Sequence, residues 1–207
     1  MIDLSTYLVF IAASAALIIV PGPAQALVIA TTLDRGPVHG ALTAVGLNVG
    51  TLVHAAAAGL GLSAVLATSA VAFSIVKYVG AAYLFYLGIM ALRRKPESDG
   101  ASVQTSAAPR AAFGQAVITG VLNPKVALFF LAFLPQFVDP AGPVFAQFLV
   151  LGVTMALLDI AYEVLLVRLV HRIKGWFLRS PRFTAIRNRI SGAVLILLGA
   201  RLAFQER

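Results

Sequence analysis

Three charged side chains lie inside stretches of this sequence that are otherwise almost entirely apolar. Asp159 and Glu163 are four residues apart, so a helix would place both on one face, and Lys125 lies in another apolar stretch. Charged groups are costly inside a bilayer and usually face a partner or a water-filled cavity. We expect Asp159 to pair with Lys125, to bind a cationic group or to carry a proton, with a purely structural ion pair as the alternative. Glu163 is expected nearer the membrane surface, where it meets Arg168 or lipid headgroups.

Prolines interrupt two apolar stretches near their middle, at Pro21-Gly22-Pro23 and at Asn123-Pro124. Proline in a helix interior removes a hydrogen bond, and unsatisfied backbone in a membrane needs protein or a wet cavity around it. Asn123 is a good N-cap and Pro124 suits the first helical position, so a new half-helix can begin there, as it can at Gly22 and Pro23. Each new N-terminus would favour a carboxylate at the centre of the bilayer. The alternative is a pair of kinks that only shape packing.

Two further polar residues, Asn48 and His54, lie in the second apolar stretch. Asn48 joins the candidate binding residues, whereas His54 is expected to be a packing residue with its hydrogen bonds satisfied. Gly46 and Gly50 have the small-xxx-small spacing that lets membrane helices approach closely. The chain has no Cys, no metal-ligand spacing of His, Asp and Glu, and no nucleophile with a base in reach. We therefore expect neither an enzyme nor a cofactor.

The composition is that of a membrane protein. Of the 207 residues, 60% are hydrophobic and 12% are charged, whereas soluble domains have roughly 25% charged residues. A span takes about 20 apolar residues, so six spans and two polar loops use the whole length, and 1–207 is one transmembrane domain. The net charge is +8, but of the 16 Lys and Arg, four lie at 93–112 and seven at 168–189. This clustering favours a role in membrane orientation over nucleic-acid binding.

Six apolar stretches predict six transmembrane helices. They cover residues 4–33, 40–66, 71–92, 113–138, 143–167 and 190–204. The two basic loops are expected in the cytoplasm, and counting spans from them places both termini outside, on the periplasmic side of the inner membrane. Residues 24–26 resemble a signal-peptide cleavage site, but Asp3 precedes them with no Lys or Arg, and the apolar run continues beyond them. We therefore interpret 4–33 as the first membrane helix.

The two halves of the chain show similar features in the same order. Prolines break the first and fourth stretches, a Gly-Pro pair follows each break, and the third and sixth stretches each carry a cation three residues before a Gly. Three helices per half force opposite orientations. The predicted fold is an all-α membrane protein of two inverted three-helix repeats, at about 1–95 and about 113–207, joined by a cytoplasmic loop at about 93–112. Matched Pro or Gly breaks in such halves point to a binding site at mid-membrane.

Several short motifs resemble those of one family. They are Pro-Gly-Pro at 21–23, Gly-Ala-Ala-Tyr-Leu at 80–84, Tyr-Leu-Gly at 86–88 and Leu-Asn-Pro-Lys at 122–125. Over essentially its whole length the chain resembles the lysine exporter and homoserine/threonine resistance (LysE/RhtB) family of amino-acid efflux proteins. The resemblance implies that a homo-oligomer exports amino acids or close derivatives from the bacterial cytoplasm, driven by proton exchange or the membrane potential. It carries over the motif positions Pro21, Gly22, Pro23, Asn123, Pro124 and Lys125, and the acid Asp159.

The residues and the resemblance together predict a zwitterionic substrate. Its carboxylate would lie at the two half-helix ends and Lys125, and its ammonium group at Asp159. Two other functions are open: a channel or carrier for a different small solute or ion, because a fold does not specify a substrate, and a membrane assembly protein without transport activity. The last of these predicts that the polar residues at mid-membrane tolerate apolar replacement.

Overall fold

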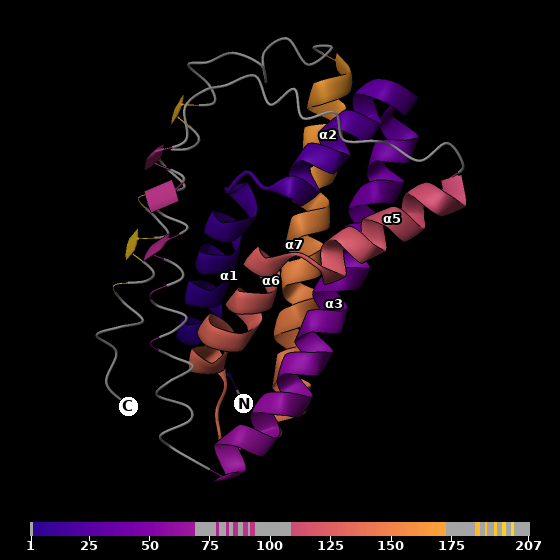
Figure 1. Ribbon diagram of the computed structural model, residues 1–207. Helices are drawn as coiled ribbons and strands as arrows, with labels where there is room; N and C mark the ends of the chain where they lie inside the picture. The colour runs from indigo at the N-terminus through magenta and orange to yellow at the C-terminus, as the bar shows by residue number, and fades with distance from the viewer. Residues whose placement is uncertain are drawn as a thin grey trace.

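A computed structural model describes residues 2–68 and 109–172, together with single helical positions between 78 and 93 and between 185 and 200. Within these residues the chain is helical and has no strand (Figure 1). The predicted stretches at 71–92 and 190–204, with their similar Gly motifs, fall mostly outside the described residues. The six spans and the inverted repeat therefore stay predictions.

Four of the predicted stretches are helical in the structure, two of them unbroken and two broken. The elements are α1 (Leu4–Ile19), α2 (Pro23–Arg35), α3 (Pro37–Thr68), α5 (Pro109–Val121), α6 (Pro124–Leu128), the π-helical turn η1 (Phe129–Phe133), the 3-10 turn η2 (Leu134–Phe137) and α7 (Val144–Arg172). Helices α3 and α7 are long and apolar enough to cross a membrane. Each broken stretch passes the same test if it counts as one bent span, so the described residues hold two candidate spans, or up to four.

The first helix begins at a capped and charged end. Asp3 accepts hydrogen bonds from the Ser5 hydroxyl at 2.5 Å, the Thr6 hydroxyl at 2.6 Å and the Thr6 backbone N–H at 3.0 Å. These donors, with that of Ser5 contributing most, hold the pKa of this exposed carboxyl well below its ordinary value. The carboxylate is therefore charged at the N-terminus of α1, where the helix dipole favours a negative group.

Helix α3 packs lengthwise between α5 and α7 (Figure 1). A side chain at Gly50 would overlap the backbone of Gly120 in α5, and one at Gly46 would lie 2.8 Å from Cβ of Ala116, one turn earlier in α5. The predicted close helix approach at Gly46 and Gly50 is thus confirmed. Small residues face each other on both helices, so the two backbones touch where α5 is about to end.

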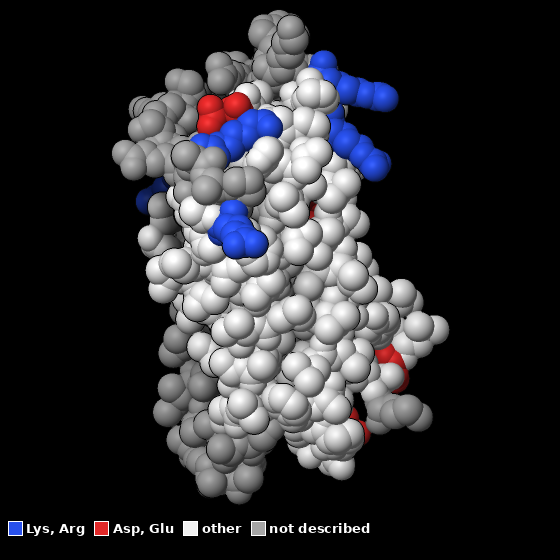
Figure 2. Space-filling model, turned by 90° about the vertical axis from the view of Figure 1, so that its right-hand side faces the viewer, with Lys and Arg blue, Asp and Glu red and all other residues white. Residues whose placement is uncertain are grey.

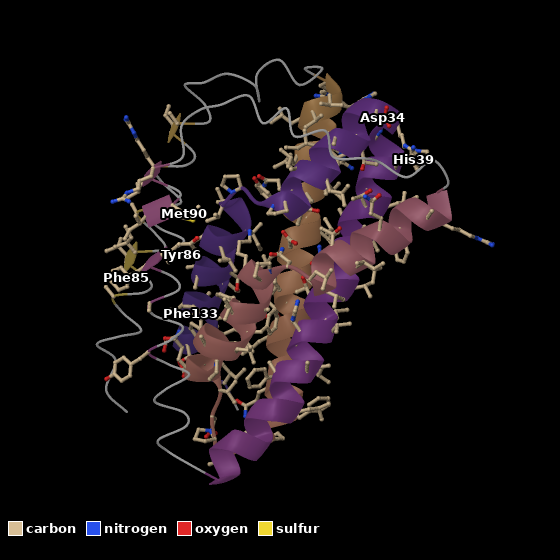
Figure 3. All side chains as sticks on the ribbon, viewed as in Figure 1. Asp34, His39, Phe85, Tyr86, Met90 and Phe133 are labelled. Atoms are coloured by element: carbon tan, nitrogen blue, oxygen red, sulfur yellow. The ribbon has the colours of Figure 1, made fainter. Side chains whose placement is uncertain are left out.

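Aromatic rings fill the space between α1, the second half of the broken fourth stretch and α7. Phe10, Phe129, Phe133 and Phe137 are all buried, and neighbouring ring centroids lie 5.1–6.4 Å apart. Figure 3 labels Phe133 within this group. The sequence does not predict the π turn η1. Pro135 lies two residues after the end of η1. Proline has no backbone N–H to donate to the preceding turn, and in a regular α-helix its ring would clash with the carbonyl four residues earlier.

Basic residues gather at one end of the described bundle. Arg35 ends α2, Arg110 lies at the start of α5, and Arg172 ends α7, and these three helix ends point the same way (Figure 1). Figure 2 shows Lys and Arg in the upper part of one face, whereas the lower part carries only acidic and uncharged residues among those described. Asp3 and Asp139 precede α1 and α7 at this opposite end.

Candidate functional site

Both predicted helix breaks are present. Helix α1 ends at Ile19 and α2 begins at Pro23, at an angle of 60° to α1; Gly22 is the N-cap residue and has extended backbone. Between α5 and α6 the chain bends by 40°. There the side chain of Asn123 accepts a hydrogen bond of 3.1 Å from the backbone N–H of Lys125, and Pro124 is the first helical residue. The predicted cap and the predicted proline position are therefore confirmed.

Lys125 joins the second break to the first. Its ammonium group donates hydrogen bonds of 3.1 Å to the Leu17 carbonyl and 3.0 Å to the Val20 carbonyl. Leu17 lies in the last turn of α1, where its carbonyl also accepts from the Val20 backbone N–H, and Val20 is the C-cap residue. A helix C-terminus favours a cation through its dipole. The ammonium group of Lys125 therefore caps the end of α1 directly before Pro21.

Asp159 contacts a different helix from the one that the sequence suggested. The Asn48 amide nitrogen in α3 donates to an Asp159 carboxylate oxygen at 3.0 Å and to the Ala44 carbonyl at 3.1 Å. Lys125 interacts electrostatically with Asp159, but among the described residues no salt bridge joins the two. The expected ion pair is thus wrong as a direct contact, because Lys125 is held at the end of α1. Asn48 contacts Asp159, and its role in substrate binding stays a prediction.

The position of Asp159 along its helix suits a mid-membrane site. It lies 15 residues beyond Val144 in the 29-residue helix α7, which is about 22 Å along the axis at 1.5 Å per residue. The side chain is partly buried. A carboxylate at this depth needs partners that replace water, and the amide of Asn48 is one of them.

Glu163 is buried, and the expectation that it reaches Arg168 or the lipid headgroups is wrong. It is 3% exposed, and its Oε2 atom has no hydrogen-bond partner in the part of the chain that the structure describes. The side chain of Arg168 is exposed instead. Glu163 interacts electrostatically with Asp159 one turn away and with Lys125. The four-residue spacing of the two acids was the signal in the sequence, and burial by neighbouring helices was the missing information.

Sequence reasoning also missed a polar contact between α2 and α7. Gln25, in the first turn of α2, is 5% exposed, and its amide donates a hydrogen bond of 2.9 Å to the Tyr162 hydroxyl. This contact brings the start of the second half-helix against the segment of α7 that carries Asp159 and Glu163. Nothing in the sequence distinguishes Gln25 except its position two residues after Pro23.

His54 is a satisfied polar residue, as expected. Its ring Nε2 lies 3.3 Å from the carbonyl oxygen of Gly120, and because a carbonyl only accepts, this nitrogen is the donor. Gly120 is in the last turn of α5, directly before the Asn123 break. His54 therefore supplies a partner to a helix end inside the membrane, and it stabilises the break.

The resulting site, which we call the break site, is formed where the two broken stretches meet α3 and α7. Lys125 links the two half-helix junctions of this site, which also contains an amide–carboxylate contact and a second buried acid. Its polar side chains are Gln25, Asn48, Asn123, Lys125, Asp159 and Glu163. Charged groups of both signs inside an otherwise apolar bundle mark a candidate site for a polar solute.

Broken helices and buried charges of both signs, as the described residues have them, are typical of membrane transport proteins. The sequence profile of the LysE type translocator family matches residues 15–206, so the chain belongs to this family. It is a transporter rather than an enzyme.

Named relatives cover most of the chain. A homoserine/homoserine lactone efflux protein of Salmonella typhi is 32% identical over 88% of each chain. A leucine efflux protein of Salmonella choleraesuis is 29% identical over 95% of this chain and 94% of its own. An uncharacterized membrane protein of Pseudomonas aeruginosa, PA4757, is 36% identical over 90% of this chain and 89% of its own. No solved structure matches this one. The family resemblance read from the motifs is therefore confirmed.

Proposed function

We propose that this protein exports amino acids or close derivatives from the bacterial cytoplasm and binds them at the break site. The observation that carries the proposal is the separation of charge there. Asp159 on α7 accepts a hydrogen bond from Asn48. The first turn of α2 contains Gln25, and it begins three residues after Val20, whose carbonyl accepts from Lys125. A zwitterionic amino acid presents the two complementary groups on one carbon. Relatives named as homoserine and leucine efflux proteins support the same class of substrate.

The substrate carboxylate belongs at the N-terminus of α2, around Pro21, Gly22 and Pro23. The N-cap residue is Gly22, which has no side chain to cap this end, and no described side chain forms a cap hydrogen bond there. At the other break, Asn123 already accepts from the first backbone N–H after Pro124. Helix N-termini bind carboxylates through free N–H groups and the positive end of the dipole. The two breaks therefore differ: the first offers donors to the substrate, and the second positions Lys125.

The substrate ammonium group belongs at Asp159. Asn48 occupies one carboxylate oxygen with a neutral donor, which orients the carboxylate and leaves acceptor capacity on it, since a carboxylate can accept about four hydrogen bonds. Lys125 is engaged with the carbonyls of α1 and does not compete for direct contact. Asp159 is thus an oriented anion inside the bundle, which is what an ammonium ligand requires.

The membrane arrangement is also part of the proposal. The end with Arg35, Arg110 and Arg172 faces the cytoplasm of the inner membrane, in line with the excess of cations in cytoplasmic loops, and both termini lie outside. Two inverted three-helix repeats over 1–207 complete six spans, and copies of the chain associate as a homo-oligomer. Export is coupled to protons or to the membrane potential.

The test is efflux from proteoliposomes loaded with labelled amino acids, including leucine and homoserine. The panel also contains a methyl ester, which lacks the carboxylate, and an N-acetyl derivative, which lacks the ammonium group. The wild type should export one class of amino acid and neither blocked derivative. Asp159→Asn removes one charge at almost unchanged shape, and transport should fall at least about tenfold because a buried charge pair is worth more than 1.4 kcal/mol.

Asp34→Asn is the matched control, because Asp34 is an exposed acid near the end of α2 and lies beside Arg35. It should transport like the wild type. Full transport by Asp159→Asn, or equal transport of the blocked derivatives, would exclude zwitterion binding at this site. Absence of efflux across the whole panel would favour a different solute.

A further inference from the structure

The two acids of α7 outnumber the cation that faces them. Asp159 and Glu163 lie one turn apart, and Lys125 is the positive group that interacts with both. Lys125 is itself held by the carbonyls of Leu17 and Val20. With both acids ionised, the cluster carries one more negative charge than positive charge inside an apolar bundle. An uncompensated buried charge costs several kcal/mol or more, so one further positive charge is needed.

Glu163 is the acid whose surroundings lack that charge. It is 3% exposed, and its Oε2 atom is unpartnered in the described part of the chain. Asp159, in contrast, accepts from Asn48. The Oδ1 atom of Asn48, on a side chain only 2% exposed, is also without a partner among the described residues. Two buried oxygen acceptors beside the acid pair therefore lack a donor in the described part of the chain.

Among the described residues, Asp159 and Lys125 are the charged groups that act on Glu163. Helices α1, α2 and α3 pack against α7. The titratable groups of α2 and the start of α3, Asp34, Arg35 and His39, lie at the basic end of the bundle (Figure 3). On α7, Tyr162 accepts from Gln25. A proton on Glu163 is the smallest ligand that supplies both the charge and the donor.

We propose that Glu163 is the proton-binding group of this transporter, and that one proton on Glu163 alternates with the ammonium group of the substrate on Asp159. Either ligand adds one positive charge to the same acid pair, so both cannot be bound favourably at once. Export of one amino acid is then accompanied by uptake of one proton, which binds the Glu163 carboxylate from outside and leaves it as a free proton inside. The second part of this inference depends on the proposed amino-acid export.

The test asks whether transport requires a proton that Glu163 can bind and release. Glu163→Gln resembles the protonated acid in shape and cannot release a proton, so it should disfavour the substrate ammonium group on Asp159. In proteoliposomes, Glu163→Gln should therefore lose both the exchange of external for internal labelled leucine or homoserine and the pH-driven net efflux, each at least about tenfold. Glu163→Asp keeps a carboxyl group that can bind and release a proton, and it should keep at least about half of both activities. Asp34→Asn should keep both.

Two results would overturn the inference. The first is pH-driven efflux by Glu163→Gln at the wild-type rate. The second is a loss of exchange and of pH-driven efflux in Glu163→Asp as large as in Glu163→Gln, in a variant that inserts and folds normally, which would make Glu163 a structural residue only.

A measurement on the wild-type protein needs neither the variant nor a substrate. Dicyclohexylcarbodiimide modifies protonated carboxyl groups in apolar surroundings, and mass spectrometry identifies the modified residue. Modification of Glu163 that declines at alkaline pH and in the presence of leucine or homoserine supports the inference. No modification of Glu163 at any pH overturns it, even if Glu163→Gln fails to insert. If the wild type exports no amino acid but Glu163 is modified, the proposed function fails and the proton site stands.

Discussion

The contact between α3 and α5 at Gly50 makes a sharp prediction for stability. A Cβ atom added at Gly50 would lie 2.5 Å from the backbone nitrogen of Val121 and closer still to the carbonyl carbon of Gly120, whereas ordinary contact begins at 3.4 Å. These are backbone atoms, which cannot move aside as a flexible side chain can. The two helices must therefore separate by about 1 Å, and interiors at crystal-like packing density resist such a shift.

The magnitude follows from two opposing effects. Replacing Gly by Ala inside a helix gains about 0.5–1 kcal/mol through backbone entropy, while overpacking costs typically about 1–3 kcal/mol. Gly50→Ala should therefore lower the free energy of unfolding by about 1–2 kcal/mol. Gly61→Ala is the matched control, because Gly61 is in the same helix and has nothing within 4 Å of its added Cβ. It should leave stability unchanged or raise it slightly.

The assay is unfolding in mixed micelles with increasing sodium dodecyl sulfate, followed by circular dichroism. The difference between the two variants isolates the clash, since both share the gain in helix propensity. Gly50→Ala should also reduce transport, because Asn48 lies half a turn away and the moved helix changes its contact with Asp159. If Gly50→Ala is as stable as Gly61→Ala, the close approach of α3 and α5 and the packing argument are refuted.

Three further predictions concern side-chain hydrogen bonds. Asn123→Ala removes the cap of α6 and should destabilise the protein by about 1 kcal/mol, with Asn123→Asp restoring most of the loss in the same unfolding assay. Tyr7→Phe removes a 2.8 Å bond to Thr154 and should cost about 1 kcal/mol without changing efflux; a large transport defect would contradict this. The lowered pKa of Asp3 in the folded protein means that its stabilisation is present above about pH 4 and is lost as the pH falls below it. Unfolding measured against pH should therefore show Asp3→Asn less stable than the wild type at neutral pH and converging with it in acid.

Much of the described fold could be predicted from the sequence, because a membrane helix is recognisable from the residues of its own segment. A run of apolar residues long enough to span a bilayer has few alternatives to a helix, so the stretches at 4–33, 40–66, 113–138 and 143–167 correspond closely to helical segments. The breaks at Pro21 and Pro124 were equally visible, since proline constrains its own backbone whatever surrounds it. The π turn at Phe129–Phe133 was not, because regular and widened turns have the same apolar composition.

The candidate site was predictable in its members and not in its contacts. Asn123 was identified as a cap from its residue type and from the proline that follows, and the structure has it in that role. Lys125 and Asp159 were expected as partners because opposite charges attract. Lys125 instead reaches carbonyls at the C-terminus of α1, and which acceptor a long cationic side chain meets depends on the angle between two half-helices.

Residue types and their spacing along single segments predict where helices lie, where two of them break, and which few polar groups interrupt the apolar stretches. Packing between helices, in contrast, sets the contact of Asn48 with Asp159, the burial of Glu163, and the link that Lys125 makes between the two breaks. Each of these contacts joins residues from different helices or depends on what covers them, and the crossing of α3, α5 and α7 that creates them is set by packing between segments distant in the chain.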